Sequence, residues 1–599
     1  MKLLRNLICC CVFLIGIPAA ATEPPNILVL TVDDMNCDSV GVYGCAVPGT
    51  TPNIDRLAAE SLRFDYAHVV VGNCMPSRNV MFSGRYPHNN GVEGFYQIPQ
   101  PKFPTATRLF REAGYFTAIR GKTTHSTPYH PYEWDLVADT LDGQKAHNKD
   151  PQSYFDSTKL ALASARKSGK RFFININVSD PHKPFYGMGG GNKRVADPFK
   201  PSRIFNADEV AVPGFLFDHP DVRQELALYY STVRRADDCV GNILRALKES
   251  GQQDNTLVLF LSDHGMPLPF AKTAVYHHST RTPLMVRWPG VTTAGQVDQD
   301  HMVSAVDILP TLLDAAQLAH PSGFDGRSFH SLLSGGKQPN RDWIVKEYNE
   351  NSGAGRHPMR SVESKRFCYI FNPWSDGKRV FKTATTGTAT YRRLRQLAGT
   401  NTALAARLDM FDHRVVEEFY DVRNDPDCLH NLIDNPKFQK ELRQHQDRML
   451  HWMKSTNDHA LKAFVARDNS QQMSDYVDEV QAQATARRAT RRKGKKTNRR
   501  RKNLFKVELP QQVTADKDYT LRIPHKLPQK LDSQQLVVTL KDAAGNRLER
   551  QTLRVAGTET ARIVFRIPAD TQSVRFAAWI GKDFDSALQY FVSDPVPVK

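Results

Sequence analysis

Four short and almost uninterrupted apolar runs stand out in the first half of the chain. They cover residues 26–32 (NILVLTV), 115–119, 171–178 (RFFININV) and 256–261 (TLVLFL). Runs of this kind are typical of strands that are buried on both faces of a parallel sheet. Apolar positions at helical spacing alternate with them, over 54–61, 107–113 and 222–250. Alternating strands and helices predict an α/β sandwich, in which helices cover both faces of a large, mostly parallel sheet.

The pattern changes after a helix-like stretch at 305–316. Shorter strands such as 366–371 and an amphipathic helix at 436–454 follow, so we expect residues 340–469 to form a smaller α+β subdomain that packs on residues 22–339. Residues 470–504 are polar and then strongly basic, without apolar periodicity, which predicts a linker. Beyond it, alternating runs separated by turn residues predict a sandwich-like all-β module over 505–599.

The first 21 residues have the basic, apolar and small-residue order of a secretory signal peptide. Their apolar part, LICCCVFLIGI, is shorter than the roughly 20 residues that a membrane-spanning helix needs. We therefore expect a leader rather than an anchor, cleavage near Thr22, and export to the periplasm or the cell exterior. No later segment is apolar for long enough to span a membrane.

Composition and charge narrow the class of protein. The chain has 599 residues, 40% hydrophobic and 24% charged, which excludes a disordered, collagen-like or disulfide-scaffold protein. The net charge is +17, but eleven Lys and Arg residues and no acid lie between Arg487 and Lys502. This basic run either contacts polyanions such as sulfated glycans or keeps the linker extended and soluble. We expect no nucleic-acid partner.

The six cysteines after the leader show no CxxC pair and no zinc spacing. A Cys37 to Cys45 disulfide is one option in an oxidising compartment. Unpaired buried thiols are the expected state for most of them, so cysteine is not the framework of the fold.

Polar residues follow three of the predicted strands at the point where each strand ends. Asp33 and Asp34 follow the first strand, Ser179-Asp180-Pro181-His182 the third, and Ser262-Asp263-His264-Gly265 the fourth. The carboxyl ends of parallel strands meet at one edge of a sheet, where active sites gather. A cluster rich in carboxylates suits Ca²⁺ or Mg²⁺ better than zinc.

The segment at 73–85, NCMPSRNVMFSGR, adds an anion site. Pro76 is suited to open a helix, which puts Cys74 just before a helix N-terminus, where free N–H groups favour a bound anion. Arg78 follows four residues later and can fold back onto that anion. Taken alone, the segment also fits a buried cysteine before an ordinary helix, or a thiolate nucleophile.

Together these motifs resemble those of the type I sulfatases, a family of the alkaline phosphatase-like superfamily. The family pattern C/S-x-P-S-R-x-x-x-x-T/S-G-R is similar to CMPSRNVMFSGR at 74–85. In the same order as in the family, the chain also has the Asp33-Asp34 pair, TPNIDRLA (51–58), GYFTAIRGK (114–122), DPH (180–182) and SDHG (262–265). The resemblance covers about residues 26–469 and implies an alkaline phosphatase-like fold and the hydrolysis of sulfate.

The resemblance also implies the reactive groups. Cys74 would be oxidised after translation to formylglycine (3-oxoalanine) by a formylglycine-generating enzyme, and the hydrated aldehyde would be the nucleophile. A Ca²⁺ ion, with Mg²⁺ as the less favoured choice, would be bound by residue 74 together with Asp33, Asp34, Asp263 and His264.

The remaining roles follow from the same resemblance. Arg78 would hold the formylglycine, and Lys122 and Lys272 would bind the sulfate. His182, near the departing atom, would act with Lys272 as the acid for the leaving group, and His125 would assist breakdown of the sulfated diol.

Two residues depart from the family pattern. Many members have G-K-x-H, whereas this chain has one more residue in Gly121-Lys122-Thr123-Thr124-His125, so His125 is our choice and His130 the alternative. His264 stands where several members have Asn, and both residue types can bind a metal through one lone pair. The pair Asp237-Asp238 also falls in a family-like stretch, and we expect it to be structural.

The strings GMPLPFAKTAVY (265–276) and HPMRSV (357–362) resemble the heparan N-sulfatase (sulfamidase) group of the family. That implies N-sulfate on glucosamine at the non-reducing end of heparan chains. Arg360 would then face the sugar, or else bridge the subdomains as a structural residue. Lys272, where that group has Arg, leaves O-sulfated sugars of other polysaccharides open, algal ones included. The sequence is also compatible with a phosphonate or phosphate monoester hydrolase and with an inactive polyanion-binding protein.

Overall fold

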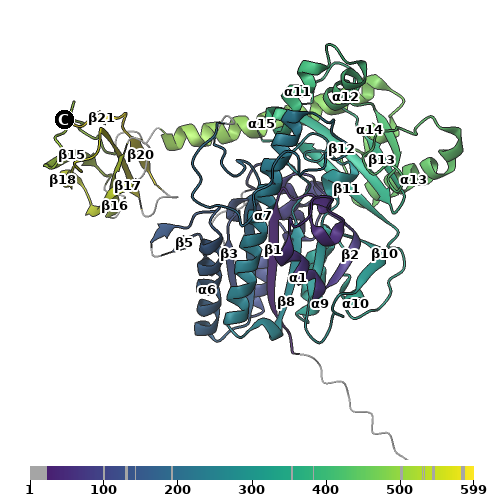
Figure 1. Cartoon of the computed structure of the whole chain (residues 1–599), viewed down its shortest axis with the longest axis horizontal. Helices are drawn as coiled ribbons and strands as arrows, with labels where there is room; N and C mark the ends of the chain where they lie inside the picture. The colour runs from purple at the N-terminus through teal and green to yellow at the C-terminus, as the bar shows by residue number, and fades with distance from the viewer. Residues whose placement is uncertain are drawn as a thin grey trace, which may run out of the picture. The chain divides into compact units, whose positions relative to one another are not determined.

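The structure is a computed structural model (Figure 1). It describes residues 23–98, 101–127, 133–141, 143–189, 193–352, 355–381, 383–499, 504–528, 531, 533–542, 547–581 and 587–599. The predicted leader at 1–21 lies outside the described residues. The chain forms two compact units, residues 1–480 and residues 481–599, and each is described by itself.

The first unit is built on an eight-stranded sheet with the order β10-β2-β9-β8-β1-β7-β3-β4. Its strands are β1 (Asn26–Asp33), β2 (Leu62–His68), β3 (Phe116–Arg120), β4 (Leu136–Val137), β7 (Phe172–Pro181), β8 (Thr256–Ser262), β9 (Leu284–Arg287) and β10 (Val297–Ser304). β9 runs antiparallel to both of its neighbours, β2 and β8, and the other pairings are parallel. The predicted mostly parallel sheet is thus confirmed, with its four apolar runs as β1, β3, β7 and β8.

Helices cover both faces of this sheet. Because side chains alternate along a strand, Leu28 and Leu30 of β1 face one apolar cluster and Ile27 and Val29 face another. The first cluster includes residues of α1 (Pro52–Ala59), α6 (Pro151–Ser168) and α7 (Pro220–Glu249). The second includes residues of α4 (Ala106–Glu112), α9 (Ile308–Ala315) and the end of α2 (Cys74–Ser83).

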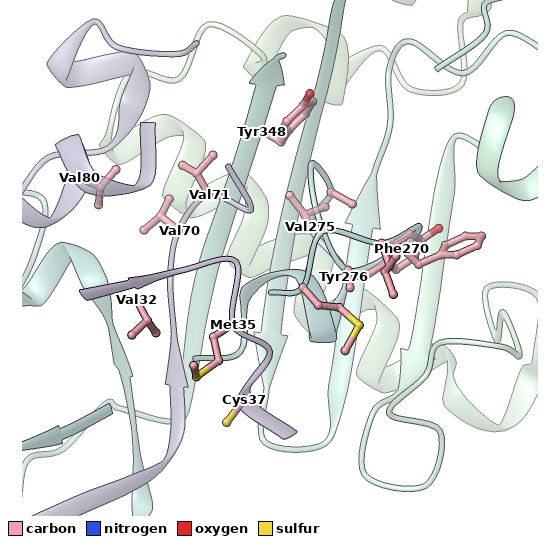
Figure 2. Packing of buried hydrophobic residues seen from close by; sticks show 14 of the residues in the cluster. Val32, Met35, Cys37, Val70, Val71, Val80, Phe270, Val275, Tyr276 and Tyr348 are labelled. Carbon is pink, nitrogen blue, oxygen red and sulfur yellow. The ribbon is translucent and has the colours of Figure 1, made fainter. Parts of the chain in front are cut away.

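Part of the first cluster lies around the ends of the central strands. Figure 2 shows Val32 of β1, Val70 after β2 and Val80 of α2, together with Phe270 and Tyr276 from the loop that follows β8. All five side chains are buried. This packing fixes the strand end, the helix and the loop relative to one another.

A four-stranded antiparallel sheet follows, with the order β11-β12-β13-β14. Its strands are β11 (Trp343–Glu350), β12 (Arg356–Ser364), β13 (Phe367–Phe371) and β14 (Glu417–Asp421), and α13 (Gln439–Ser455) packs on β12 and β13. The first apolar cluster continues into this sheet through Val345 and Met359 and reaches Met449 of α13. The α+β part therefore shares its core with the large sheet.

The remaining elements of the first unit are short. They are α3 (Pro87–Asn90), α5 (Thr123–Ser126), α8 (His277–Thr280), α10 (His330–Leu333), α11 (Ala389–Leu397), α12 (Thr402–Asp412), α14 (Leu461–Val465), β5 (Thr140–Leu141) and β6 (Gln144–Lys145).

Residues 470–504 differ from the expected linker. They begin with a long helix, α15 (Ser470–Arg499), whose Met473, Tyr476, Val477 and Val480 are buried in the first cluster. These four residues have the spacing of a helix stripe, so the prediction that this segment lacks apolar periodicity is wrong. The many polar residues between them conceal the stripe when composition alone is considered.

The second unit contains a small β-sandwich, as expected for the C-terminal module. One sheet pairs β15 (Asp518–Lys526) with β18 (Thr558–Arg566). The other has the order β17 (Arg547–Val555), β16 (Gln534–Asp542), β19 (Ser573–Gly581) and β20 (Gln589–Val592), with β21 (Val596–Pro597) also on β19. Leu521 and Phe565 of the first sheet share a cluster with Leu536 and Phe576 of the second. Among the described helices of the chain, none has the length and apolar character to cross a membrane.

Candidate active site

Three carboxylates and a histidine meet at the ends of β1 and β8. Val32 pairs with Ser262, so Asp33 and Asp34 after one strand lie beside Asp263 and His264 after the other. All four are fully buried. Asp34 has a φ of 71°, which is uncommon for a residue with a side chain, and its N–H donates to Asp263 Oδ1 at 3.1 Å.

Close backbone contacts require glycine at position 265 of the SDHG motif. A Cβ atom at Gly265 would lie 2.1 Å from the carbonyl oxygen of His278 and 2.5 Å from that of Ala271. A larger residue would therefore push away the loop that carries Lys272.

Cys74 is the first residue of α2, with Asn73 before it as the N-cap, rather than the residue before the helix. Its Sγ lies 3.3 Å from Asp33 Oδ1 and 3.3 Å from His264 Nε2. Burial and then the charge of Asp33 raise the pKa of the Cys74 thiol well above its usual value. An unmodified Cys74 is therefore a thiol at neutral pH, which argues against a thiolate nucleophile.

Arg78 points into the same cluster from the next turn of α2. Its Nη2 lies 2.9 Å from Asp263 Oδ2, and the side chain is fully buried. Nη1 donates to Thr31 Oγ1 at 2.6 Å and to Asn177 Oδ1. Sequence reasoning did not select Thr31 or Asn177, although each is a polar residue inside an apolar strand, which is the signal that marks them.

Two lysines pair with the carboxylates. Lys122, which has a φ of 52° on the turn after β3, forms an ion pair with Asp33. Lys272 Nζ lies 2.6 and 2.7 Å from the two carboxylate oxygens of Asp34. Burial disfavours the charged lysines, but Asp33 and Asp34 outweigh it and raise the pKa of Lys122 and of Lys272, respectively. Both lysines are protonated at neutral pH.

The pKa values of the three carboxylates are shifted in different directions. Although burial acts to raise it, the pKa of Asp33 is held well below its usual value, chiefly by Lys122, and that of Asp34 is lowered by Lys272. Burial and then the charge of Asp33 raise the pKa of Asp263. Three carboxylates are thus balanced by Lys122, Lys272 and Arg78, with Asp263 bearing most of the mutual repulsion.

The donor atoms fit a hard divalent cation. His264 Nδ1 lies 3.0 Å from the carbonyl oxygen of Gly265, so the ring carries its hydrogen there and presents the Nε2 lone pair to the cluster. Ligand atoms of Asp33, Cys74, Asp263 and His264 all lie within 4.8 Å of one another. A set of carboxylate oxygens with one imidazole nitrogen suits Ca²⁺ or Mg²⁺, and the lone pair of His264 is oriented as a ligand requires.

His182 lies next to this cluster and is half-buried. Ligand atoms of Asp34, Cys74 and His182 lie within 4.8 Å of one another. His182 Nδ1 lies 2.6 Å from the Lys183 carbonyl oxygen, and Lys149 Nζ donates to the His182 carbonyl at 2.6 Å. Burial lowers the pKa of His182, so its ring is neutral at neutral pH.

His125 belongs to α5, next to Lys122. Its ring packs edge-on against Phe95 at 5.4 Å between centroids. Burial and then the charge of Lys122 lower the pKa of His125 to about 3, so this ring is also neutral. The alternative, His130, lies outside the described residues.

Comparison with known proteins identifies this arrangement. Residues 25–318 match the sulfatase family, and residues 263–375 match the family described as N-sulphoglucosamine sulphohydrolase, C-terminal. The chain contains a sulfatase-family domain over residues 25–318. It is therefore an enzyme, a hydrolase of sulfuric esters.

The alignments with individual relatives extend over most of this sulfatase. Human N-sulphoglucosamine sulphohydrolase is 29% identical over 484 residues, which cover 75% of this chain and 94% of the relative. An ulvan-active sulfatase from Formosa agariphila is 27% identical over 448 residues, 74% of this chain and 82% of the relative.

Solved structures share the fold. A putative sulfatase from Bacteroides thetaiotaomicron matches with a TM-score of 0.55 and 22% identity, over 73% of this chain and 93% of that chain. The phosphonate monoester hydrolase of Agrobacterium radiobacter matches with a TM-score of 0.51 and 18% identity, over 72% of this chain and 96% of that chain. At these identities the likeness establishes the fold alone.

Arg360 is the predicted site residue that the sulfatase does not bring to the cluster. Its Nε and Nη2 donate to the carboxylate of Asp458 at 2.5 and 2.8 Å, and Glu347 lies 3.5 Å away. The side chain is fully buried, and these partners all belong to the smaller α+β part. These contacts argue against the expectation that Arg360 faces the sugar. They support the alternative that it is a structural residue, although its partners lie within the α+β part and not in both subdomains.

Asp180 and Asp237, each in a family-like stretch of the sequence, both make structural contacts. Asp180 of the DPH motif turns away from the cluster and pairs with Lys149 and with Arg235, whose Nε is 2.6 Å away. Asp237 accepts hydrogen bonds from the N–H groups of Asn53 and Ile54 at 2.9 and 2.8 Å, which caps the start of α1. The structural role expected of Asp237 is thus supported. Cys37 and Cys45 are free thiols.

Proposed function

We propose that this sulfatase removes the N-sulfate of glucosamine at the non-reducing end of heparan-type chains. The observation that carries the proposal is the match of residues 263–375 to the C-terminal family of N-sulphoglucosamine sulphohydrolase. This region includes the loop of Lys272 and most of the antiparallel sheet, the parts that we expect to contact the leaving group. The match to human N-sulphoglucosamine sulphohydrolase, which covers 94% of that protein, also supports the proposal.

We further propose that Cys74 is converted to formylglycine and that a Ca²⁺ ion is bound by residue 74 with Asp33, Asp34, Asp263 and His264. When present, the formylglycine supplies the nucleophile and the ion supplies a Lewis acid. The charge balance supports this pairing of groups. Three carboxylates and three cations already cancel, so the single negative charge of the substrate's sulfate group offsets half of the charge of a divalent cation, and the doubly charged sulfate product offsets all of it.

The chain's own residues divide the remaining work. Lys122 and Lys272, which pair with Asp33 and Asp34 in the structure, turn to the sulfate oxygens, and Arg78 holds residue 74. Lys272 carries the proton that the departing nitrogen or oxygen needs. His182 donates its Nδ1 hydrogen to a backbone carbonyl, so it acts with Lys272 after Nε2 has taken up a proton. His125, being neutral, would accept a proton from residue 74 when the sulfate is released.

The linkage is tested by digesting defined heparan oligosaccharides and following the N-sulfate and each O-sulfate separately. We expect loss of N-sulfate from a non-reducing-end glucosamine and no loss when the same residue is internal. A Cys74→Ala variant, which cannot form formylglycine, is the control and should be inactive. The N-sulfatase assignment is wrong if that N-sulfate survives while an O-sulfate is released.

O-sulfate on another polysaccharide is the second candidate. It is favoured by the similarity to ulvan-active sulfatases and by Lys272, which replaces the arginine of the sulfamidase group. Release of sulfate from ulvan oligosaccharides, with heparan oligosaccharides left intact, would establish it. Sulfate, phosphate and phosphonate esters of one chromogenic alcohol distinguish a sulfatase from a phosphonate or phosphate monoester hydrolase.

We also propose that the protein is exported and meets a formylglycine-generating enzyme in its host. Protein from that host should begin near Thr22, which N-terminal sequencing determines. Mass spectrometry of the peptide that contains residue 74 should find formylglycine. An unmodified cysteine there would instead support an inactive, polyanion-binding protein.

A further inference from the structure

Among the described residues, the outward face of one sheet in the β-sandwich carries basic residues and no acids. In the sheet β17-β16-β19-β20, the inward positions such as Leu536, Val538 and Phe576 belong to the apolar cluster. Side chains alternate along a strand, so the neighbours of these residues point outward. Among the described residues of β16, β17 and β19, the outward basic side chains are Lys541, Arg547, Arg550, Arg554 and Arg575, and no outward residue is acidic. We name these five residues the cationic face (strands β16, β17 and β20 are labelled in Figure 1).

Three residues of the cationic face form a row across neighbouring strands. Lys541 of β16 pairs with Arg547 of β17 on one side and with Arg575 of β19 on the other. Side chains in such positions are about 5 Å apart at Cβ, and like charges directly opposite one another destabilise a sheet. The row therefore has an electrostatic cost in the free protein, and a bound anion would remove it.

The side chains of β17 in this face are available to a partner. Arg547, Arg550 and Arg554 are exposed. No carboxylate of the described residues forms an ion pair with any of the three. The opposite sheet differs, because Arg522 pairs with Glu508 and Arg566 with Asp518, each at 3.5 Å. Among the described residues, one sheet of the sandwich thus pairs two of its outward arginines with carboxylates, and the other sheet leaves Arg547, Arg550 and Arg554 without such a pair.

Aromatic and apolar groups lie at the other edge of the same sheet, on β20. Tyr590 and Val592 of β20 are 52% and 43% exposed, and they pair with Trp579 and Ala577 on the outward side of β19. An exposed ring gives a sugar ring a flat apolar surface on which to pack, while the arginines bind sulfate or carboxylate groups. A membrane surface would need an apolar patch or a lipid anchor, and the described part of the face has a single exposed ring.

We propose that the cationic face is a binding site for a sulfated polysaccharide, separate from the active site. This inference rests on the proposed function, because a polymeric sulfated substrate is what makes such a partner relevant to the enzyme. The face would hold the polymer while the active site works on the end of a chain. It is also distinct from the basic run at 487–502.

The test uses the full chain and immobilised heparin as the probe. In one variant Arg547, Arg550 and Arg554 are changed to Gln, and in the control variant Arg522, Arg562 and Arg566 of the opposite sheet are changed to Gln. Both lose three positive charges from exposed strand positions of the same module. We expect the first variant to bind heparin about tenfold more weakly, since three exposed ion pairs contribute a factor of about two each. The control should bind nearly as the parent does.

Equal weakening in the two triple variants would overturn the proposal, and so would unchanged binding in both. Repeating the comparison in a chain whose Lys and Arg residues at 487–502 are Gln removes the contribution of the basic run. A DNA duplex of matched charge is the second probe, and a loss for DNA as large as for heparin would also contradict selectivity for a sulfated polysaccharide. Melting temperatures show that the module is folded in each variant.

Turnover of a small sulfate ester separates this inference from the proposed function. All variants should keep it, because none changes the active site. Heparin binding that falls as expected in a protein without sulfatase activity would refute the proposed function and support the site. Full activity with unchanged heparin binding would support the proposed function and refute the site.

Discussion

Replacing Asp458 by Asn tests how Arg360 is used. The change leaves the shape almost unaltered and keeps an oxygen for the N–H of Ala460, which Asp458 Oδ1 accepts at 3.0 Å. It removes the charge that faces the fully buried guanidinium of Arg360 at 2.5 and 2.8 Å. Two charge-assisted hydrogen bonds are weakened at once, and a buried cation loses its chief partner. We expect the free energy of unfolding to fall by about 3–5 kcal/mol.

Two further variants separate the contributions of Arg360 and Asp458 to stability. Arg360→Met alone should also destabilise the protein, because Asp458 is then buried without its cation. Glu347, the other carboxylate near Arg360, still has a partner in this variant, because His88 Nδ1 lies 2.7 Å from it. The double variant Arg360→Met/Asp458→Asn should therefore cost less than the two single changes added together, by about 2 kcal/mol or more.

Urea denaturation measures these free energies, and steady-state kinetics on a small sulfate ester measure KM and kcat in parallel. A structural pair predicts large changes in stability and little change in KM for protein that remains folded. The reasoning is refuted if Arg360→Met keeps the parental free energy of unfolding while KM for a glucosamine substrate rises. That result would restore the sugar contact expected from the sequence.

The remaining predictions concern charge at other places. Lys272→Met should lower kcat for a small sulfate ester by about a hundredfold or more, measured by initial rates, because it removes a buried cation beside the reacting groups. Burial acts to lower the pKa of His278, but hydrogen bonds with Asp38 and Asp427 raise it to about 9. The stability this adds is complete below the unfolded pKa near 6.5 and is lost as pH rises through 9, so the free energy of unfolding should fall by about 3 kcal/mol over that range. Urea denaturation at several pH values checks this, and His278→Gln should flatten the profile. Chelation of divalent cations should abolish turnover, and Ca²⁺ should restore it better than Mg²⁺ in the same assay. Deleting 487–502 should weaken retention on a heparin column and leave turnover of a small ester intact, if the basic run contacts polyanions.

Much of the fold follows from the sequence because the central strands are buried on both faces. The run at 256–261 is almost purely apolar, and it forms β8 from Thr256 to Ser262. Three of the candidate site residues could be selected for a related reason. Asp33, Asp34 and Asp263 directly follow two such strands, and carboxylates at two strand ends of one sheet indicate a shared site more strongly than one pair does.

Other features depend on contacts between residues far apart in the chain, which no local pattern contains. The strand that carries Arg360 lies in a family-like string, but the partner that decides its role, Asp458, is 98 positions away. The stripe on α15 was missed because polar residues dilute it. Strand β17 lies at an exposed sheet edge, so RLERQTLRV has the composition of a polar segment and no local pattern marks it as a strand.

The net charge of +17 is a poor guide to the charge that matters for the reaction. Three of the 80 Lys and Arg residues, Arg78, Lys122 and Lys272, converge on the carboxylate cluster. They are neutralised there, so they add nothing to the local sum in the structure. A divalent cation alone would add two uncompensated charges to this buried site, and the sulfate group of a substrate alone would add one. Under the proposed function we therefore expect the cation and the sulfate group to stabilise one another's binding, and the lysines to exchange Asp33 and Asp34 for sulfate oxygens when the cation binds those carboxylates.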